Sequence, residues 1–434
     1  MPDKQSVQRE TMTELSIDGK EWLTGLERIG KLAEEKPDTV FNNLGHHINV
    51  ENLLEVYREI EGNKAIGRDG ITKEEYGRDL LNNLKELVRR IHNGSYKPQP
   101  ARLIEIPKED GSTRPLVISC FEDKLVQSIE NKILTKIFEP MFLPCSYGFR
   151  ENHSCHEALR ALRKHVDEAK DGAVVEIDIR KCFNTIPHKP LMEILKTKIA
   201  DYRFLKLLDK LIRMPIIEDG EVKVNTIGCP QGSIISPILA NIYLYEVIDK
   251  WFAEIKKSHM KGKAEMVRYA DDMVFIFEEY EDADRFFRVL PKRLKKYGLE
   301  IHTEKSQILK SGEVAAVKED TKQRRLGTYK FLGFICYWGK SRRGRWRLKF
   351  KSRADRFTAK LKKMREYLRK NLNTSATHEL LKRVILAIKG WINYHAISDN
   401  ERRVKSFIHK SKWLIYKWFN RRGSKHSATW ERMT

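Results

Sequence analysis

Residues 268–277 read Arg-Tyr-Ala-Asp-Asp-Met-Val-Phe-Ile-Phe. In this stretch an acidic pair, Asp271-Asp272, separates two apolar half-strands, a pattern that predicts a β-hairpin with carboxylates at its tip. Aspartate is disfavoured inside a strand because burial penalises its charge. Taken alone, the pair is better explained as an ordinary tight turn, so its meaning depends on the rest of the chain.

A second apolar strand also ends near a carboxylate. Residues 174–179 read Val-Val-Glu-Ile-Asp-Ile, which predicts a buried strand with Asp178 near its end. Both hydrophobic segments carry the free-energy cost of an aspartate within an apolar strand, which indicates a bound cation that offsets this cost. Two Mg²⁺ ions roughly 3.5–4 Å apart would bridge an attacking 3′-hydroxyl and a triphosphate in an in-line displacement.

The three aspartates, Asp178, Asp271 and Asp272, are therefore predicted to be both catalytic and metal-binding. Successive side chains of a strand point to opposite faces. We therefore expect Asp271 to share direct ligation with Asp178, and Asp272 to have a lesser or partial role. The chemistry that such a site supports is nucleotidyl transfer with two Mg²⁺ ions as the cofactor.

The chain is strongly basic, with a formal net charge of +23. Residues 340–434 hold 28 Lys and Arg against 6 Asp and Glu, a net charge of +22, so nearly all the excess lies in the last quarter. Helical spacing of apolar residues there favours a folded helical domain over a solvated tail. A phosphate backbone is its expected ligand, because neutralised phosphates release counterions. The apolar residues are Leu361, Met364 and Leu368; Leu381, Val384, Ile385 and Ile388; and Trp413, Tyr416, Trp418 and Phe419.

Composition excludes several other classes. Hydrophobic residues make up 41% of the chain, too many for wholesale disorder, and no apolar run reaches membrane-spanning length. Residues 1–20 are polar with mixed charges, unlike a signal peptide or an anchor. The six cysteines form no Cys-x-x-Cys pair, which argues against zinc and for reduced thiols in a cytoplasmic protein.

Hydrophobic periodicity predicts an α+β chain whose C-terminus is all helical. The 434 residues suggest two or three domains in contact. Expected helices cover residues 22–32, 49–60, 76–91, 121–138, 155–169, several segments up to about 214, then 236–255, 283–297 and most of the chain after 350. Expected strands cover residues 102–106, 174–179, 266–277 in two halves, 299–301, 329–337 and 346–350, with hairpin turns at 108–114 and at Asp219-Gly220.

Several motifs resemble those of a known family. Tyr269-Ala270-Asp271-Asp272 resembles the signature of reverse transcriptases. Pro230-Gln231-Gly232-Ser233, together with Ser236-Pro237 and Asn241, resembles the nucleotide-pocket motif of the same family. Further motifs between residues 63 and 430 resemble the reverse transcriptase/maturases encoded in group II introns. They are Asn63-Lys64 with Gly67-x-Asp69-Gly70, Tyr96-Lys97-Pro98-Gln99-Pro100, Ile106-Pro107-Lys108 with Thr113-Arg114-Pro115-Leu116, Ser146-Tyr147-Gly148-Phe149-Arg150 with Cys155-His156-Glu157-Ala158, Leu332-Gly333-Phe334, and Gly390-Trp391-Ile392-Asn393-Tyr394.

The resemblance implies a right-hand polymerase fold with fingers, a palm built on an antiparallel sheet, and a helical thumb. The implied domains are an N-terminal helical extension (1–92), fingers (93–170), a catalytic palm that includes some finger-contacting helices (171–338), and a basic helical thumb or maturase domain (339–434).

The resemblance also implies roles at the nucleotide site. Lys108 and Arg114 would hold the incoming triphosphate, Arg as a bidentate fork and Lys as a point charge. Gln231 and Gly232 would border the nucleotide, which a glycine allows to approach closely. Without the resemblance, the first pair is a charged hairpin tip and the second an ordinary turn.

Three more residues are assigned in the same way. Phe183, five residues after Asp178, would close on the sugar 2′-carbon and exclude ribonucleotides. Ile179 is counted with both the metal-binding and the nucleotide-binding residues, and Lys305 matches a lysine near the active site. Without the resemblance, Phe183 is more typical of a core residue and Lys305 of a surface lysine.

Two features depart from the family. Phe-Phe-Asp commonly follows the first catalytic strand, whereas this chain has Cys182-Phe183-Asn184, which puts the local packing and one polar contact in doubt. The sequence ends shortly after Trp430-Glu431 without a Cys/His-rich endonuclease, so target-strand cleavage is not expected.

The expected function is the copying of RNA into DNA, together with the binding and splicing of the protein's own intron RNA. Expected partners are group II intron RNA, an RNA template with a DNA or RNA primer, dNTPs and a DNA target, in a bacterial cytoplasm and without a membrane. The oligomeric state stays open between monomer and dimer. The alternatives are a retron-like or phage-defence reverse transcriptase, against which the motifs at 63–70 and 390–394 argue, and a splicing-only RNA-binding maturase, against which the intact aspartates argue.

Overall fold

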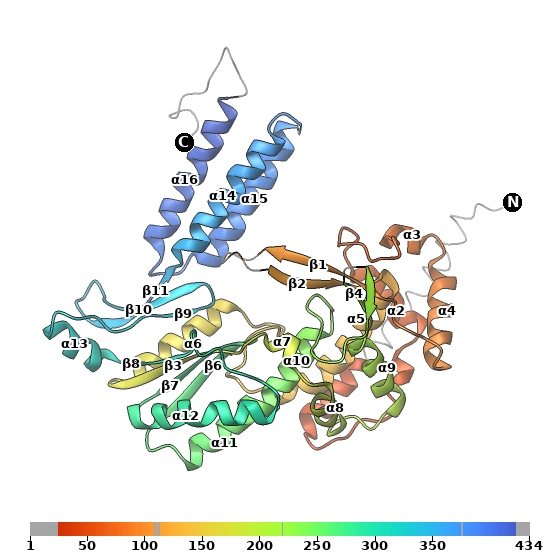
Figure 1. The fold of residues 1–434 in the computed structure, drawn as a ribbon, viewed down its shortest axis with the longest axis horizontal. Helices are drawn as coiled ribbons and strands as arrows, with labels where there is room; N and C mark the ends of the chain where they lie inside the picture. Colours follow the sequence, from red (N-terminus) through yellow and green to blue (C-terminus); the bar gives the residue numbers. More distant parts are fainter. Residues whose placement is uncertain (1–24, 108–110, 112, 219, 375, 422–434) are drawn as a thin grey trace.

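The computed structural model describes residues 25–107, 111, 113–218, 220–374 and 376–421. Lys108, predicted to bind the triphosphate, lies outside these residues. Figure 1 shows helices and a small sheet at the right, a larger sheet covered by helices at the lower left, and the long C-terminal helices at the top. The predicted α+β class is confirmed.

The N-terminal third is helical, as expected, and packs around one buried helix, α5. Residues 25–35 are helical, and the elements that follow are η1 (Gly45–His47), α2 (Val50–Glu59), α3 (Lys73–Gly77), α4 (Leu80–His92), α5 (Phe121–Phe138) and η2 (Glu139–Met141). The α5 helix carries buried apolar residues around most of its circumference, including Leu125, Ile129 and Ile133. A helix that is apolar on most sides belongs in a core.

A small sheet continues from this core, in the order β2-β1-β4-β5. Its strands are β1 (Ala101–Pro107), β2 (Thr113–Ile118), β4 (Ile216–Glu218) and β5 (Glu221–Lys223). β1 and β2 form the antiparallel hairpin expected from the sequence, and β4 joins β1 in parallel. Arg114 therefore lies on β2, one residue from the described end of the hairpin.

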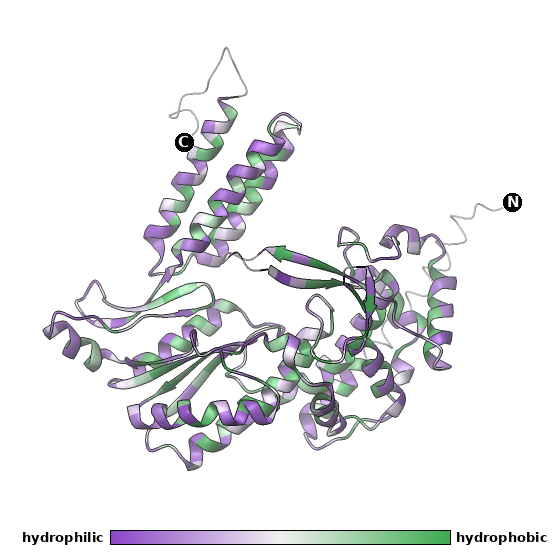
Figure 2. Ribbon diagram, in the orientation of Figure 1, coloured by the Kyte–Doolittle hydropathy of each residue, from purple (hydrophilic) through white to green (hydrophobic). Residues whose placement is uncertain are grey.

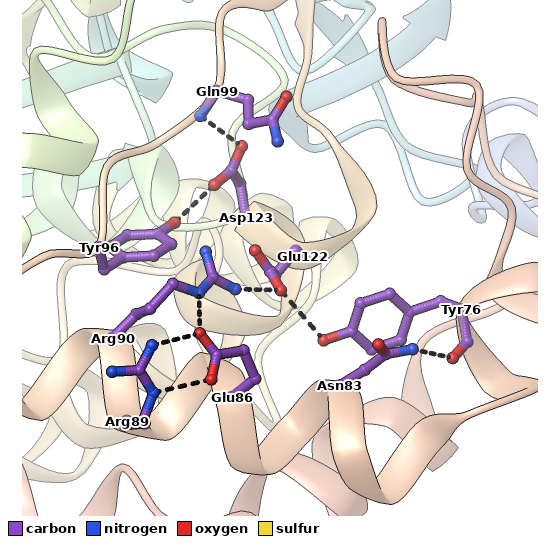
Figure 3. Close-up of polar contacts among 9 residues, drawn as sticks. All are labelled: Tyr76, Asn83, Glu86, Arg89, Arg90, Tyr96, Gln99, Glu122 and Asp123. Atoms are coloured by element: carbon purple, nitrogen blue, oxygen red, sulfur yellow. Dashed lines mark hydrogen bonds and ion pairs between the residues drawn. The ribbon is translucent and has the colours of Figure 1, made fainter.

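A polar network fixes the chain segment that leads into β1 (Figure 3). Asp123 on α5 accepts hydrogen bonds from the Tyr96 hydroxyl (2.5 Å) and from the Gln99 backbone N–H (3.1 Å). Its neighbour Glu122 accepts one from the Arg90 guanidinium on α4 (2.6 Å). Burial raises the pKa of Asp123 to about 7. The base of the hairpin is thus anchored to the helical core.

The central sheet is antiparallel, in the order β6-β7-β3-β8. Its strands are β3 (Gly172–Asp178), β6 (Ala264–Tyr269), β7 (Asp272–Phe277) and β8 (Gln307–Ser311). Side chains alternate between the two faces, so Val175 and Phe275 join the large N-terminal core while Val174 and Val274 join a second core. Asp178 and Asp272 lie on the same face of the sheet as Val174 and Val274, the face of the second core.

Helices cover both faces of this sheet. One face packs against α12 (Tyr280–Lys296) and a long helix made of α10 (Ser236–Leu244), η3 (Tyr245–Asp249) and α11 (Lys250–Ser258). The other face packs against α6 (Cys155–Glu168) and a sheet of β9 (Tyr329–Phe331), β10 (Phe334–Lys340) and β11 (Trp346–Ser352). Three further helices, α7 (Cys182–Thr185), α8 (His188–Lys196) and α9 (Tyr202–Ile212), connect β3 to β4.

Three basic helices complete the fold: α14 (Ala354–Asn371), α15 (Thr377–His395) and α16 (Glu401–Phe419). Apolar and polar residues alternate along them in Figure 2, and the rings of Phe357, Trp391 and Phe407 meet at the centre of the bundle. The predicted folded helical domain is therefore present. Among the apolar residues that predicted it, Ile385 and Trp413 are exposed rather than packed.

The remaining differences from the sequence prediction have local causes. β8 and α13 (Glu313–Thr321) were not predicted, because neither has a strong apolar period. Residues 299–301 form only an isolated bridge, between Ile301 and Ile179, instead of a strand. β10 crosses the expected domain boundary between 338 and 339 and pairs with β11. Within the described ranges, no helix has the length and apolar character to cross a membrane.

Candidate active site

The three predicted aspartates lie at one end of the central sheet. Asp178 ends β3 directly opposite Asp272, the first residue of β7, and Asp271 lies in the turn between β6 and β7. All three line one cleft of about 710 Å³, together with Arg114 from β2 and Lys305. Residues from four separate segments of the chain are thus brought together.

Asp178 is the most accessible of the three carboxylates. Its side chain is 44% exposed, and the Lys305 ammonium lies 3.8 Å from its Oδ2. Its backbone N–H donates to the Ser306 hydroxyl (3.1 Å), which fixes the end of the strand. An exposed ion pair of this length contributes little to stability, so Asp178 can exchange this partner for another cation.

Asp271 and Asp272 are held in a less polar setting. Burial raises the pKa of Asp271, and the nearby Asp178 carboxylate raises it further, while the Arg114 guanidinium partly opposes both. Burial raises the pKa of Asp272 to about 7, although the Leu332 backbone N–H donates to its Oδ2 (3.0 Å). Carboxylates in this position gain from a cation that stabilises their charged form.

The donor chemistry suits magnesium. Along the described residues, no three His, Cys, Asp or Glu side chains converge closely enough to hold a metal unaided. Mg²⁺, however, is usually bound through one or two carboxylates, several waters and the phosphates of a substrate. Asp178 and Asp271 offer oxygen ligands in a cleft that also contains Arg114, so the residues present fit an ion delivered with a triphosphate.

A buried arginine holds the turn that carries Asp271. The Arg268 side chain, fully buried on β6, pairs with the buried carboxylate of Asp249 through Nε (2.8 Å) and Nη2 (2.6 Å). Its Nη1 donates to the Asn241 side chain and to the Ala270 backbone carbonyl, both at 3.0 Å. Ala270 has a φ of 57°, a left-handed conformation that costs an alanine free energy unless contacts stabilise it.

A π turn aligns the partners of this arginine. Asn241 and Asp249 are eight residues apart, and in a regular α-helix they would lie about 80° apart around the axis. The π turn η3, which ends at Asp249, turns through a smaller angle per residue and reduces that offset. Both side chains can therefore reach Arg268. The helix predicted over 236–255 is confirmed, and this π turn lies inside it.

The predicted nucleotide-pocket residues form a second group beside the cleft. The Gln231 side-chain amide donates to the side-chain Oδ1 of Asn184 (3.0 Å), and the Phe183 backbone carbonyl accepts from the Cys229 backbone N–H (2.7 Å). Gly232 has a φ of 103°, and a Cβ there would lie 2.4 Å from the Val117 carbonyl of β2. Asn184, which stands where the family commonly has an aspartate, is therefore the residue that holds Gln231.

Not every predicted residue faces the cleft. Phe183, Gln231 and Gly232 lie outside the walls around the aspartates, and the side chain of Ile179 is buried, with only 2% exposed. Sequence reasoning missed Arg353 and Arg356, which line the cleft from the junction between β11 and α14. It also assigned no role to Arg268 and Asp249. Both could have been found from the sequence, because each is a charged residue within an apolar strand or helix pattern.

The curated relatives include intron-encoded proteins. The chain is 31% identical over 314 residues to the group II intron-encoded protein LtrA of Lactococcus lactis subsp. cremoris, covering 72% of this chain and 50% of LtrA. It is 35% identical over 212 residues to protein YkfC of Escherichia coli K12, covering 48% and 55%. It is 34% identical over 216 residues to the putative COX1/OXI3 intron 1 protein of Saccharomyces cerevisiae, covering 50% and 26%. The chain thus spans about half the length of LtrA.

A family match agrees with the geometry of the cleft. Residues 106–336, just over half of the chain, match the family described as "Reverse transcriptase (RNA-dependent DNA polymerase)". This range contains the three aspartates, Arg114 and Lys305. The chain therefore belongs to the reverse transcriptase (RNA-directed DNA polymerase) family.

Proposed function

We propose that this protein copies RNA into DNA from dNTPs by two-metal nucleotidyl transfer. The observation that carries the proposal is the single cleft in which Asp178, Asp271 and Asp272 lie with Arg114 and Lys305, in a chain of the reverse transcriptase family. Primer extension on an RNA template tests it. The proposed right-hand division is an extension (1–92), fingers (93–170), palm (171–338) and thumb (339–434).

Each side chain of the cleft has a proposed task. Asp178 and Asp271 would hold two Mg²⁺ ions, which stabilise charge on the attacking 3′-oxygen and on the departing pyrophosphate. Asp272 would have the lesser role, since its Oδ2 already accepts from Leu332. Arg114, with Lys108 as a point charge, would bind the triphosphate, and Lys305 would neutralise charge beside Asp178.

A basic groove along the thumb is the proposed track for the primer–template duplex. Arg356 lines both the cleft and a groove between α14 and α15, and Lys360 and Lys363 line this groove and its continuation toward Arg383. These basic residues form a continuous positive track that begins beside the aspartates and runs along two helices, which suits a phosphate backbone.

This track predicts where the salt dependence of RNA binding originates. If about six phosphates are contacted, the slope of log affinity against log salt is near −4 to −5. The triple variant Lys360→Gln, Lys363→Gln and Arg383→Gln should flatten it by about two to three units. Fluorescence anisotropy against a salt series measures the slope.

The matched control neutralises Lys292, Lys295 and Lys296, which are exposed on α12, on the opposite face of the sheet from the cleft. A smaller change than in the groove variant is expected. Equal flattening by both triple variants would show that the groove has no special place in binding.

Phe183 is the proposed sugar gate. Its half-buried ring follows Asp178 by five residues, next to the Asn184 that holds Gln231. Phe183→Ala should give the ribonucleotide 2′-hydroxyl room and lower the preference for dNTPs on the order of 10- to 100-fold. Competition between dNTPs and rNTPs measures the preference, and Phe183→Tyr should retain it. Unchanged preference in an active Phe183→Ala enzyme would return the ring to a packing role.

The finer proposal is that a group II intron encodes this enzyme, which binds the intron RNA, assists its splicing, and helps the intron to insert into a DNA target. LtrA is by its name a group II intron-encoded protein, and the basic thumb suits a structured RNA. The intron itself is a ribozyme, so splicing would need no catalytic residue of the protein. A retron-like enzyme would synthesise DNA without promoting splicing, and a splicing-only maturase would do the reverse.

A further inference from the structure

Phe149 is an exposed phenylalanine in a strained conformation beside the nucleotide site. Its φ is 57° and its side chain is 55% exposed. A bulky residue rarely adopts positive φ, and such strain persists only where neighbouring contacts impose it. The ring meets the Phe183 ring edge to face, with centroids 6.2 Å apart and an interplanar angle of 86°. This geometry is a favourable aromatic contact.

The residue before Phe149 packs directly on the catalytic turn. A Cβ at Gly148 would lie 2.3 Å from the Ala270 backbone nitrogen, so only glycine allows this close approach. The Asn241 side-chain amide donates to the Gly148 carbonyl (2.7 Å), and its oxygen accepts from Arg268. The same buried network therefore holds the turn that bears Asp271 and the loop that bears Phe149.

The residue after Phe149 is fixed as firmly. The Arg150 side chain is largely buried and pairs with Glu139 (2.7 Å). It also donates to the backbone carbonyls of Leu143 (3.0 Å) and Ser146 (2.7 Å). With both neighbours anchored, the backbone that carries the Phe149 ring is held in place beside Phe183.

We propose that Phe149 is a second specificity-determining residue, whose ring supports Phe183 from the side and keeps the gate closed against a 2′-hydroxyl. This depends on the sugar-gate role proposed above for Phe183. Asn241 acts as a positioning residue, because it joins the loop of Phe149 to the catalytic turn. If the exposed Phe149 ring only stabilised the fold, the free-energy cost of its left-handed backbone would have no return.

The decisive variant is Phe149→Gly, because glycine suits the positive φ and removes the ring without adding strain. The thermal midpoint should stay the same or rise. The ratio of kcat/KM for a dNTP to that for the matching rNTP should fall about two- to tenfold, the size of one edge-to-face contact. Most of the fall should come from better use of the rNTP.

Two controls separate the ring from the loop. Asn152→Gly relieves a second left-handed residue of the same loop, with a φ of 60°, and should leave the ratio as in the wild type. Phe149→Tyr keeps an aromatic ring at this position and should keep the wild-type ratio. In the double variant with Phe183→Ala, removal of Phe149 should add little, because both residues act through one gate.

The possible failures are distinguishable. If Phe183→Ala lowers the ratio and Phe149→Gly does not, the inference is overturned while the gate stands. An equal loss of kcat/KM for both nucleotides also overturns it, and assigns the ring to the base or the template. If neither variant changes the ratio, the gate assignment fails together with the inference. Absence of primer extension by the wild type refutes the proposed function itself.

Discussion

Asp271→Asn should lower primer extension in Mg²⁺ by about 10³-fold or more, since several kcal/mol of charge stabilisation depend on a full carboxylate. The fold should not suffer, because burial already raises the pKa of Asp271 and a neutral amide avoids that penalty. RNA affinity should stay nearly unchanged, since the basic groove lies along α14 and α15. Single-turnover extension and anisotropy measure the two quantities.

Asp284→Asn is the matched control for this variant, because Asp284 is a partly exposed aspartate of α12 that pairs only with Arg288 among the described residues. It should retain primer extension. If the protein assists intron splicing, Asp271→Asn should retain that activity too. Substantial extension by Asp271→Asn in Mg²⁺ would remove Asp271 from the metal site.

Arg268→Met should destabilise the protein by about 3–5 kcal/mol, because it leaves the fully buried carboxylate of Asp249 without its partner. It also removes the donor that holds the Ala270 carbonyl, so the turn that bears Asp271 loses its anchor. Urea unfolding measures the first effect. The kcat of primer extension, at a temperature where the variant is folded, measures the second.

The double variant Arg268→Met with Asp249→Leu separates these two effects. Replacement of a whole buried pair by apolar residues is often neutral, so most of the stability should return. The kcat should stay low, because nothing restores the hydrogen bond to Ala270. Recovery of full activity along with stability would show that Arg268 has a purely structural role.

Much of the geometry of the candidate site could be predicted because it depends on local patterns. Strand alternation and the interruption of apolar segments by acidic residues located Asp178 and Asp271-Asp272, and the structure places them in one cleft. The predicted hairpin that bears Arg114 follows from a similar pattern. Patterns with periods of 2.0 and 3.6 residues describe single elements well.

The missed features depend on contacts between distant segments. The partners of Arg268 come from a helix 19 and 27 residues earlier in the chain, and a π turn aligns them. Periodicity does not reveal this turn, because α10 is buried on nearly every side and so offers no apolar stripe whose phase the turn could shift. The strain at Phe149 and Ala270 is likewise invisible in the sequence, since neither residue is one that favours positive φ.

Primer extension by the wild-type chain tests the central claim most directly. A labelled DNA primer annealed to an RNA template is incubated with dNTPs and Mg²⁺, and the products are treated with ribonuclease. We predict primers extended to the end of the template, resistant to ribonuclease and absent when EDTA removes the metal. Failure to extend in Mg²⁺, by a folded preparation that binds the same primer–template, would contradict the account.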